Sequence, residues 1–156
     1  MMMYHSSNVS VENPDTKHSR QYLDFGRGFY LTSLKEQAVR YAQRFKRRGQ
    51  QAWLNTYELV YKENTWNIKR FDSYDKQWLD FVAQCREGKE VGNYDMVIGG
   101  IANDRVIITL DRYFIGEISQ EEALGLLRFE KPNIQYCIRS ERMLKECLTF
   151  IESEQL

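Results

Sequence analysis

Apolar and polar residues alternate along this chain with two different periods, which together predict a mixture of strands and helices. A period of two covers Trp53 to Tyr61, where every second side chain is aromatic, aliphatic or small and polar. A helical period begins at Leu34, and Gly49 ends the predicted helix. The apolar stripe of this helix consists of Leu34, Ala38, Tyr41, Ala42 and Phe45.

Turn and capping residues divide the rest of the chain into shorter elements. Ser119 and Glu122 have the spacing of a capping box, which predicts a helix that runs to about Arg128. The Gly99-Gly100 pair is expected to break the strand that starts at Tyr94. Further strands are expected at 1–4, 28–32, 66–71, 94–98, 134–138 and 148–151, and further helices at 75–86, at 105–115 (helical or mixed) and after Ser140.

The order of these elements predicts the fold class. Strands and helices are mixed without a strict strand–helix–strand alternation, which indicates an α+β fold and argues against a doubly wound parallel sheet. A length of 156 residues suits one domain with a substantial core, so we expect a single domain spanning 1–156.

Composition narrows the function classes. The 22 basic and 22 acidic residues balance, so no overall field draws the chain toward nucleic acid. The chain has no apolar run near the ~18 residues that a membrane span needs, and the start MMMYHSSNVSVENP lacks the features of a signal peptide. Cys85, Cys137 and Cys147 show no Cys-x-x-Cys spacing, so we expect reduced core thiols, a cytoplasmic protein and no metal site.

Candidate chemistry begins in the segment Phe25 to Thr32. Gly26-Arg27-Gly28 lacks the Lys-Ser/Thr continuation of a phosphate-binding loop, but its glycines permit close approach of the backbone to a flat group. In a strand, Gly28, Tyr30 and Thr32 share one face. Phe29 and Leu31 take the other face as the natural core pair. Tyr30 is therefore expected to line a cleft.

Two further residues can join Tyr30 in a site. Tyr41 lies on the helix stripe that faces the sheet, and two tyrosines could sandwich a planar cationic ring. The alternative for Tyr41 is a core tyrosine whose hydroxyl reaches the edge. His5 directly follows the first predicted strand, where the alternative is an ordinary polar residue at the rim of a sheet.

These residues resemble the first two motifs of the ADP-ribosyltransferase superfamily, in the branch with a His-Tyr-Glu triad that includes poly(ADP-ribose) polymerases and diphtheria-type toxins. The resemblance lies in Tyr4-His5, in FGRGFYLT and in Tyr41, eleven residues after Tyr30. Nearly the whole chain is also similar to DUF3990, a family of small bacterial proteins placed in that superfamily. The similar segments are HSRQYLDFGRGFYLT, YDMVIGGIANDRV, ISQEEAL and KPNIQYCIRSERML. The resemblance implies an ADP-ribosyltransferase-like fold of split antiparallel or mixed β-sheets with flanking helices.

The resemblance also implies roles in binding NAD⁺ as co-substrate. His5 would bond the adenine-side ribose, and the backbone of Ser6 would hold the nicotinamide carboxamide. Tyr30 and Tyr41 would stack on the nicotinamide ring. The implied catalytic residues are His5, Tyr30 and Gln135, and the implied NAD⁺-binding residues are Ser6, Arg27, Gly28, Thr32 and Tyr41.

Two positions depart from the branch's usual pattern. Ser6 stands where glycine is usual, and a backbone contact survives there only if φ stays negative. Gln135 stands where the triad has glutamate, and an amide supplies neither negative charge nor a general base. Loss of one such group typically costs on the order of 10²–10³ in rate. Asp24 and Glu141 are candidates for a substitute carboxylate.

The expected function is therefore NAD⁺-dependent mono-ADP-ribosyl transfer to a protein or nucleic-acid acceptor. Family resemblance implies a toxin whose small partner protein acts as antitoxin. The alternatives are an NAD⁺ glycohydrolase and an inactive module that binds NAD⁺, ADP-ribose or a protein. A basic helix face would contact nucleic acid or the partner, or is simply solvated. This face consists of Arg40, Arg44, Lys46, Arg47 and Arg48.

Overall fold

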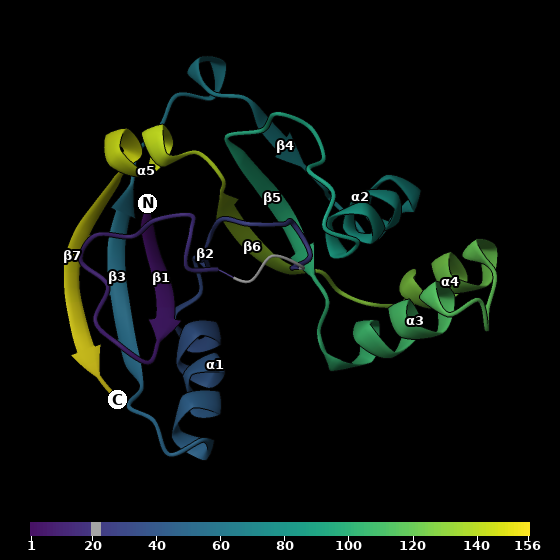
Figure 1. Ribbon diagram of the computed structural model, residues 1–156, viewed down its shortest axis with the longest axis horizontal. Helices are drawn as coiled ribbons and strands as arrows, with labels where there is room; N and C mark the ends of the chain where they lie inside the picture. The colour runs from purple at the N-terminus through teal and green to yellow at the C-terminus, as the bar shows by residue number, and fades with distance from the viewer. Residues whose placement is uncertain (20–22) are drawn as a thin grey trace.

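The computed structural model describes residues 1–19 and 23–156 and has the elements drawn in Figure 1. Its strands are β1 (Met2–Ser7), β2 (Phe29–Leu31), β3 (Trp53–Leu59), β4 (Ile68–Arg70), β5 (Met96–Ile101), β6 (Asn133–Ile138) and β7 (Leu148–Gln155). Its helices are α1 (Lys35–Arg47), α2 (Lys76–Arg86), α3 (Asp104–Phe114), α4 (Gln120–Leu127) and α5 (Glu141–Cys147), with a 3₁₀ turn η1 (Glu63–Thr65).

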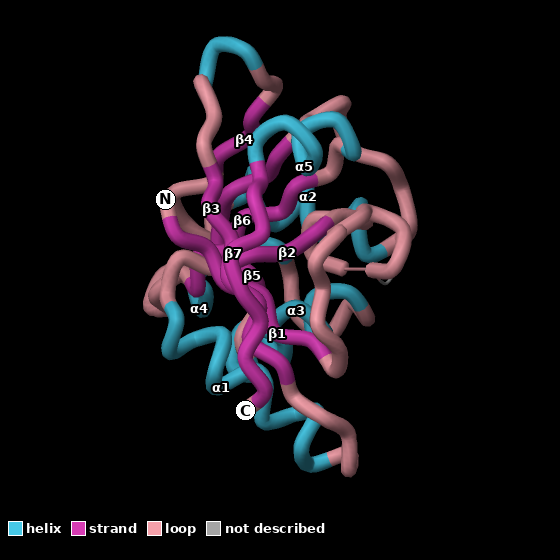
Figure 2. The backbone as a smooth tube through the Cα atoms, turned by 90° about the vertical axis from the view of Figure 1, so that its left-hand side faces the viewer, coloured by secondary structure: helices cyan, strands magenta, loops and turns pink. Residues whose placement is uncertain are grey.

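The strands form two sheets, which confirms the α+β class. The first sheet is antiparallel, with the order β1-β3-β7, and the second is mixed, with the order β2-β6-β5-β4 and a parallel β4–β5 pair. The helices lie around these strands (Figures 1 and 2). A single antiparallel bridge between Tyr4 and Thr32 connects the two sheets.

Apolar residues collect on both faces of the second sheet. One cluster includes Phe29 and Leu31 of β2 with Met3 of β1, so it lies where the two sheets face each other. The expectation that Phe29 and Leu31 form a core pair is thus confirmed, since they are 6% and 0% exposed. The other cluster joins Phe25 and Cys137 to residues of α2, α3 and α4. α1 packs against β1 and β3 and buries Ala38 and Ala42.

Local capping explains where several helices begin. Ser119 and Glu122 form the expected capping box at the start of α4, with both reciprocal bonds present. Ser140 accepts a bond from the N–H of Met143 and caps α5 as predicted. Asp75 caps α2 in the same way through the N–H of Trp78.

The Gly99-Gly100 pair does not end a strand, contrary to the sequence-based expectation. β5 continues through both glycines to Ile101. A Cβ at Gly100 would lie 2.6 Å from the Tyr74 ring and 3.0 Å from Pro132. The glycines therefore permit close packing against the sheet rather than a break. β7 also runs four residues beyond its predicted end, because it pairs with β3 as far as Trp53.

The three cysteines are free and buried, as expected. Burial raises the pKa of Cys137 to about 12 and that of Cys85 to about 11, so both remain thiols at neutral pH. Across residues 1–19 and 23–156, every helix is too short or too polar to cross a membrane.

Candidate functional site

The candidate site lies where β1, β2 and α1 meet. The Tyr4 N–H donates to the Thr32 carbonyl at 2.8 Å, and the Thr32 N–H donates to the Tyr4 carbonyl at 3.0 Å. α1 begins three residues after this bridge. We call this region the strand–helix junction. It comprises residues 4–6, residues 30–32, Gln37, Ala38, Tyr41 and Gln135.

The main-chain N–H and C=O groups of Ser6 point away from β3. In an antiparallel strand, the N–H and C=O groups of alternate residues point to opposite neighbours. The main-chain groups of Tyr4 bond with Thr32, so those of Ser6, two residues further on, point away from β3. In the described part of the chain every non-glycine φ is negative, so serine at this position keeps the required backbone conformation. Ser6 thus presents one donor and one acceptor side by side.

The side chain of Ser6 connects β1 to α1. Ser6 is 9% exposed, and its hydroxyl donates to the carbonyl of Ala38. This bond fixes the first turns of α1 beside the end of β1.

His5 is oriented by a backbone carbonyl. Its Nδ1 lies 2.7 Å from the Tyr30 carbonyl, which can only accept, so Nδ1 carries the proton. The imidazole also lies 4.2 Å from the Phe29 ring, centroid to centroid. Burial lowers the pKa of His5, although the bond to Tyr30 opposes this shift. The neutral ring therefore keeps Nε2 as an acceptor, which suits a ribose hydroxyl.

Gln135 meets Thr32 through a residue that the sequence analysis did not select. The Gln135 Nε2 donates to Gln37 Oε1 at 2.9 Å, and the Thr32 hydroxyl donates to the same oxygen at 2.5 Å. The Thr32 hydroxyl in turn accepts the N–H of Leu34 at 3.1 Å. A signal for Gln37 does exist in the sequence, because it precedes Tyr41 by four residues and so lies on the same helix face.

Tyr30 is held more tightly than the sequence suggested. Its ring stacks on Phe25 at 6.4 Å, and its hydroxyl donates to the Gly26 carbonyl at 2.6 Å and accepts the Phe25 N–H at 3.1 Å. Burial raises the pKa of Tyr30 well above its usual value. Tyr30 therefore packs against the second core cluster and is not free to move in a cleft. Replacement by alanine would remove core packing as well as any ligand contact.

Tyr41 is the accessible aromatic residue of the pair. It is 47% exposed, contacts the Phe45 ring edge-on and has the Arg44 guanidinium 4.6 Å from its ring centroid. Among the described residues, the aromatic contacts of Tyr30 and Tyr41 are with other rings and not with each other. The two-tyrosine clamp thus stays a prediction.

Arg27 and Gly28 precede β2 at the edge of the junction. Arg27 is exposed, whereas Gly28 is buried and its N–H donates to the Ser19 hydroxyl at 3.1 Å. A Cβ at position 28 would lie 2.8 Å from the Ile138 carbonyl. Gly28 is therefore required for the approach of this loop to β6, a structural reason that does not depend on a ligand.

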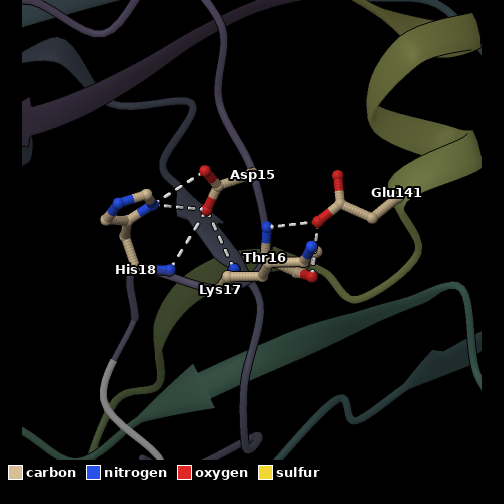
Figure 3. A network of polar contacts seen from close by, with 5 residues as sticks. All are labelled: Asp15, Thr16, Lys17, His18 and Glu141. Carbon is tan, nitrogen blue, oxygen red and sulfur yellow. Dashed lines mark hydrogen bonds and ion pairs between the residues drawn. The ribbon is translucent and has the colours of Figure 1, made fainter.

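The two candidate substitute carboxylates already have structural partners. Asp24 accepts bonds from Arg86 at 2.8 Å and from the N–H of Ala102 at 2.7 Å. Glu141 accepts bonds from the N–H and hydroxyl of Thr16 at 2.8 and 2.7 Å (Figure 3). These bonds lower the pKa of Glu141. Both carboxylates hold loops in place, and the group that meets Thr32 and Gln37 at the junction is the neutral amide of Gln135.

Comparison with protein families identifies the family of this chain. The family model DUF3990, described as a protein of unknown function, matches residues 1–150. The chain belongs to the DUF3990 family. Comparisons with curated proteins and with solved structures find no match. The family match of this DUF3990 protein covers every residue of the junction.

Surface hollows and metal ligands add little to the site. One hollow, lined by Lys35, Glu36, Val39 and Arg40, lies on α1, and another lies around Val60. Within the ranges 1–19 and 23–156, the acidic, His and Cys side chains form no cluster that could hold a metal ion.

Proposed function

We propose that this DUF3990 protein is an NAD⁺-dependent ADP-ribosyltransferase that uses the strand–helix junction. The observation that carries the proposal is the donor–acceptor pair on the main chain of Ser6, which points away from β3 and is complementary to a carboxamide. Three segments that are far apart in sequence surround it: His5 with the Tyr30 carbonyl, α1 with Tyr41, and β6 with Gln135. This convergence is what the resemblance to the split-sheet fold of that superfamily implies.

The proposed reaction breaks the N-glycosidic bond between nicotinamide and ribose. The bonding electron pair leaves with the nicotinamide ring, and an acceptor atom attacks the anomeric carbon and loses a proton. Ser6 holds the carboxamide, Tyr41 covers the ring, and the His5 Nε2 accepts a hydroxyl of the adenine-side ribose. Gln135 bonds the 2′-hydroxyl of the nicotinamide-side ribose. Positioning of the reactants supplies much of the rate, because these groups are neutral.

A binding module is the second candidate, and the Gln135–Gln37 amide pair favours it. A neutral amide does not stabilise the positive charge that develops on the ribose, and Asp24 and Glu141 are engaged elsewhere. In this case NAD⁺ or ADP-ribose would bind without turnover. If the protein is a transferase, the neutral amide of Gln135 predicts slow turnover. Hydrolysis of NAD⁺ to free ADP-ribose is then a side reaction of the transferase. A toxin role with a small antitoxin partner follows from the family resemblance.

The test removes the main-chain N–H of Ser6, which is the proposed hydrogen-bond donor to the carboxamide. Ser6→Pro removes the Ser6 N–H without removing a bond to β3, because that N–H points away from β3. Ser6→Ala is the matched control, because it removes the hydroxyl and keeps the N–H. Calorimetric titration with NAD⁺ should show roughly tenfold weaker binding for Ser6→Pro, the value of about one hydrogen bond. Ser6→Ala should bind NAD⁺ like the wild type.

Nicotinamide release, followed by chromatography, separates the two candidates. Binding with release supports the transferase, and binding without release supports the module. Absence of NAD⁺ binding by the folded wild-type protein would refute both.

A further inference from the structure

α1 and its C-cap residue Arg48 carry a concentration of positive charge at exposed positions. Arg40, Arg44, Arg47 and Arg48 follow the spacing i, i+4, i+7, i+8, so they form one stripe, which we call the arginine stripe. All four side chains are exposed. The chain as a whole has a net charge of zero, so this stripe is a local feature that the composition hides.

In the part of the chain that the structure describes, some of the other cations form ion pairs with acidic residues, and the arginine stripe belongs with the cations that do not. On other helices, Lys76 pairs with Asp80 at 2.9 Å and Arg142 pairs with Glu146 at 2.7 Å. No ion pair of the described residues includes a member of the arginine stripe. The stripe is therefore a row of exposed positive charges without acidic neighbours in contact.

Helix stability does not account for the arginine stripe. Cations in the last turn interact favourably with the helix dipole, which covers Arg44 and Arg47. Arg40 lies in the middle of α1, beyond the reach of that effect. Like charges at i and i+4 also destabilise a helix, and the stripe has two such pairs, Arg40 with Arg44 and Arg44 with Arg48. The two like-charge pairs therefore offset part of the favourable dipole interaction of Arg44 and Arg47.

The geometry of the arginine stripe is suited to phosphate groups. Arg40, Arg44 and Arg48 rise along the helix by about 6 Å per step, comparable with the separation of neighbouring phosphates on a nucleic-acid strand. All four residues are arginine, whose planar guanidinium binds phosphate through two parallel bonds. An acidic protein surface would need carboxylates in this same regular row, whereas any nucleic-acid backbone supplies it.

We propose that the arginine stripe binds the phosphate backbone of a nucleic acid and that this nucleic acid is the acceptor for ADP-ribose. The assignment of this nucleic acid as the acceptor rests on the proposed function, whereas the binding of nucleic acid to the arginine stripe does not. The stripe continues along the helix face that begins with Gln37 and Tyr41, and Arg44 lies over the Tyr41 ring at 4.6 Å. A strand bound along α1 therefore extends directly to the residues that hold the nicotinamide side of NAD⁺.

The experiment measures binding of fluorescein-labelled single-stranded DNA and RNA of about 20 nucleotides by fluorescence anisotropy over a range of salt concentrations. The test variant is Arg40→Gln/Arg47→Gln/Arg48→Gln, which leaves Arg44 in place against Tyr41. The matched control is Lys62→Gln/Lys131→Gln/Lys145→Gln, which removes the same charge from exposed positions outside α1.

The test variant should bind roughly 10- to 100-fold more weakly at about 50 mM salt, and its salt slope should fall by about 2, the value for three lost phosphate contacts on a single strand. The control variant should bind like the wild type. The proposal would be overturned if both variants lost the same affinity for the oligonucleotide, or if the wild type did not bind it. It would also be overturned if an equal charge of polyglutamate displaced the oligonucleotide completely, and this result would favour an acidic protein partner.

A second arm adds radiolabelled NAD⁺ to the wild-type protein with the oligonucleotide and a cell lysate. Label on nucleic acid, removed by nuclease, supports the acceptor assignment, and label only on protein overturns it. If the oligonucleotide binds through the stripe but no nicotinamide is released in any mixture, the proposed enzymatic function fails while the binding surface stands.

Discussion

The substitution Gln135→Glu tests whether β6 supplies the third member of the catalytic site. It exchanges a neutral amide for a carboxylate of nearly the same shape at a partly buried position. At present the Gln135 Nε2 donates to Gln37 Oε1 at 2.9 Å, and the Thr32 hydroxyl donates to the same oxygen at 2.5 Å. In the variant, a carboxylate oxygen of Glu at this position would face Gln37 Oε1, and both oxygens are hydrogen-bond acceptors.

General values for single interactions give the size of both effects. Gln37 can rotate its amide and donate to the new carboxylate, but the Thr32 hydroxyl then loses its present acceptor. One lost hydrogen bond costs about 1 kcal/mol, which lowers the melting temperature of a chain of this size by roughly 2–4 °C. A carboxylate beside the developing positive charge of the ribose should raise the rate by about 10²-fold or more. The variant should thus be slightly less stable and much faster.

Nicotinamide release at saturating NAD⁺ measures the rate, and differential scanning fluorimetry measures the stability. Gln77→Glu is the matched control, because it makes the same chemical change at an exposed position in the first turn of α2. It should leave the rate unchanged. If Gln135→Glu binds NAD⁺, melts within a few degrees of the wild type and turns over no faster, Gln135 does not act at the reacting carbon.

Three further substitutions and one change of pH test other parts of the structure. Tyr41→Ala should weaken NAD⁺ binding about tenfold or more, because stacking on the ring is lost. The melting temperature should be nearly unchanged, because the ring is half-exposed. If calorimetry shows that the variant binds NAD⁺ as tightly as the wild type, Tyr41 is not part of the site. Gly28→Ala should lower the free energy of unfolding by about 1–3 kcal/mol, since its Cβ would meet the Ile138 carbonyl at 2.8 Å. Gly125→Ala, inside α4, should raise that free energy by about 0.5–1 kcal/mol, and urea denaturation checks both signs. Burial lowers the pKa of His5 in the folded state, so His5 is protonated first in the unfolded chain as the pH falls. The free energy of unfolding should therefore decrease as the pH falls below the ordinary histidine pKa of 6.5. A denaturation midpoint that does not change from neutral pH to below about 6 would contradict the burial of His5.

Capping chemistry and periodicity in the sequence were sufficient for most of the elements. The capping box at Ser119 and Glu122 and the buried pair Ala38 and Ala42 of α1 depend on residues within a few positions of each other, so local spacing determines them. The alternation in β2 likewise placed Phe29 and Leu31 in the core. Leu34 and Tyr41, which were expected on the same buried stripe as Ala38 and Ala42, are 61% and 47% exposed. The same local reasoning failed at Gly99-Gly100, where the need for glycine arises from Tyr74 and Pro132, which are distant in sequence.

The polar contacts of the junction could not be read from the sequence in this way. Gln37 bonds Gln135 across 98 positions of the chain, and the Tyr30 hydroxyl is bound by the loop that leads into its own strand. A sequence pattern shows on which face a residue lies, but which group stands opposite depends on how the two sheets and α1 pack. The sequence by itself determined most of the elements and the class of fold. Only the tertiary structure decided that Tyr30 packs against the core, that the main-chain pair of Ser6 points away from β3 and that the arginine stripe forms no ion pair among the described residues. Each of these depends on contacts between segments far apart in the chain.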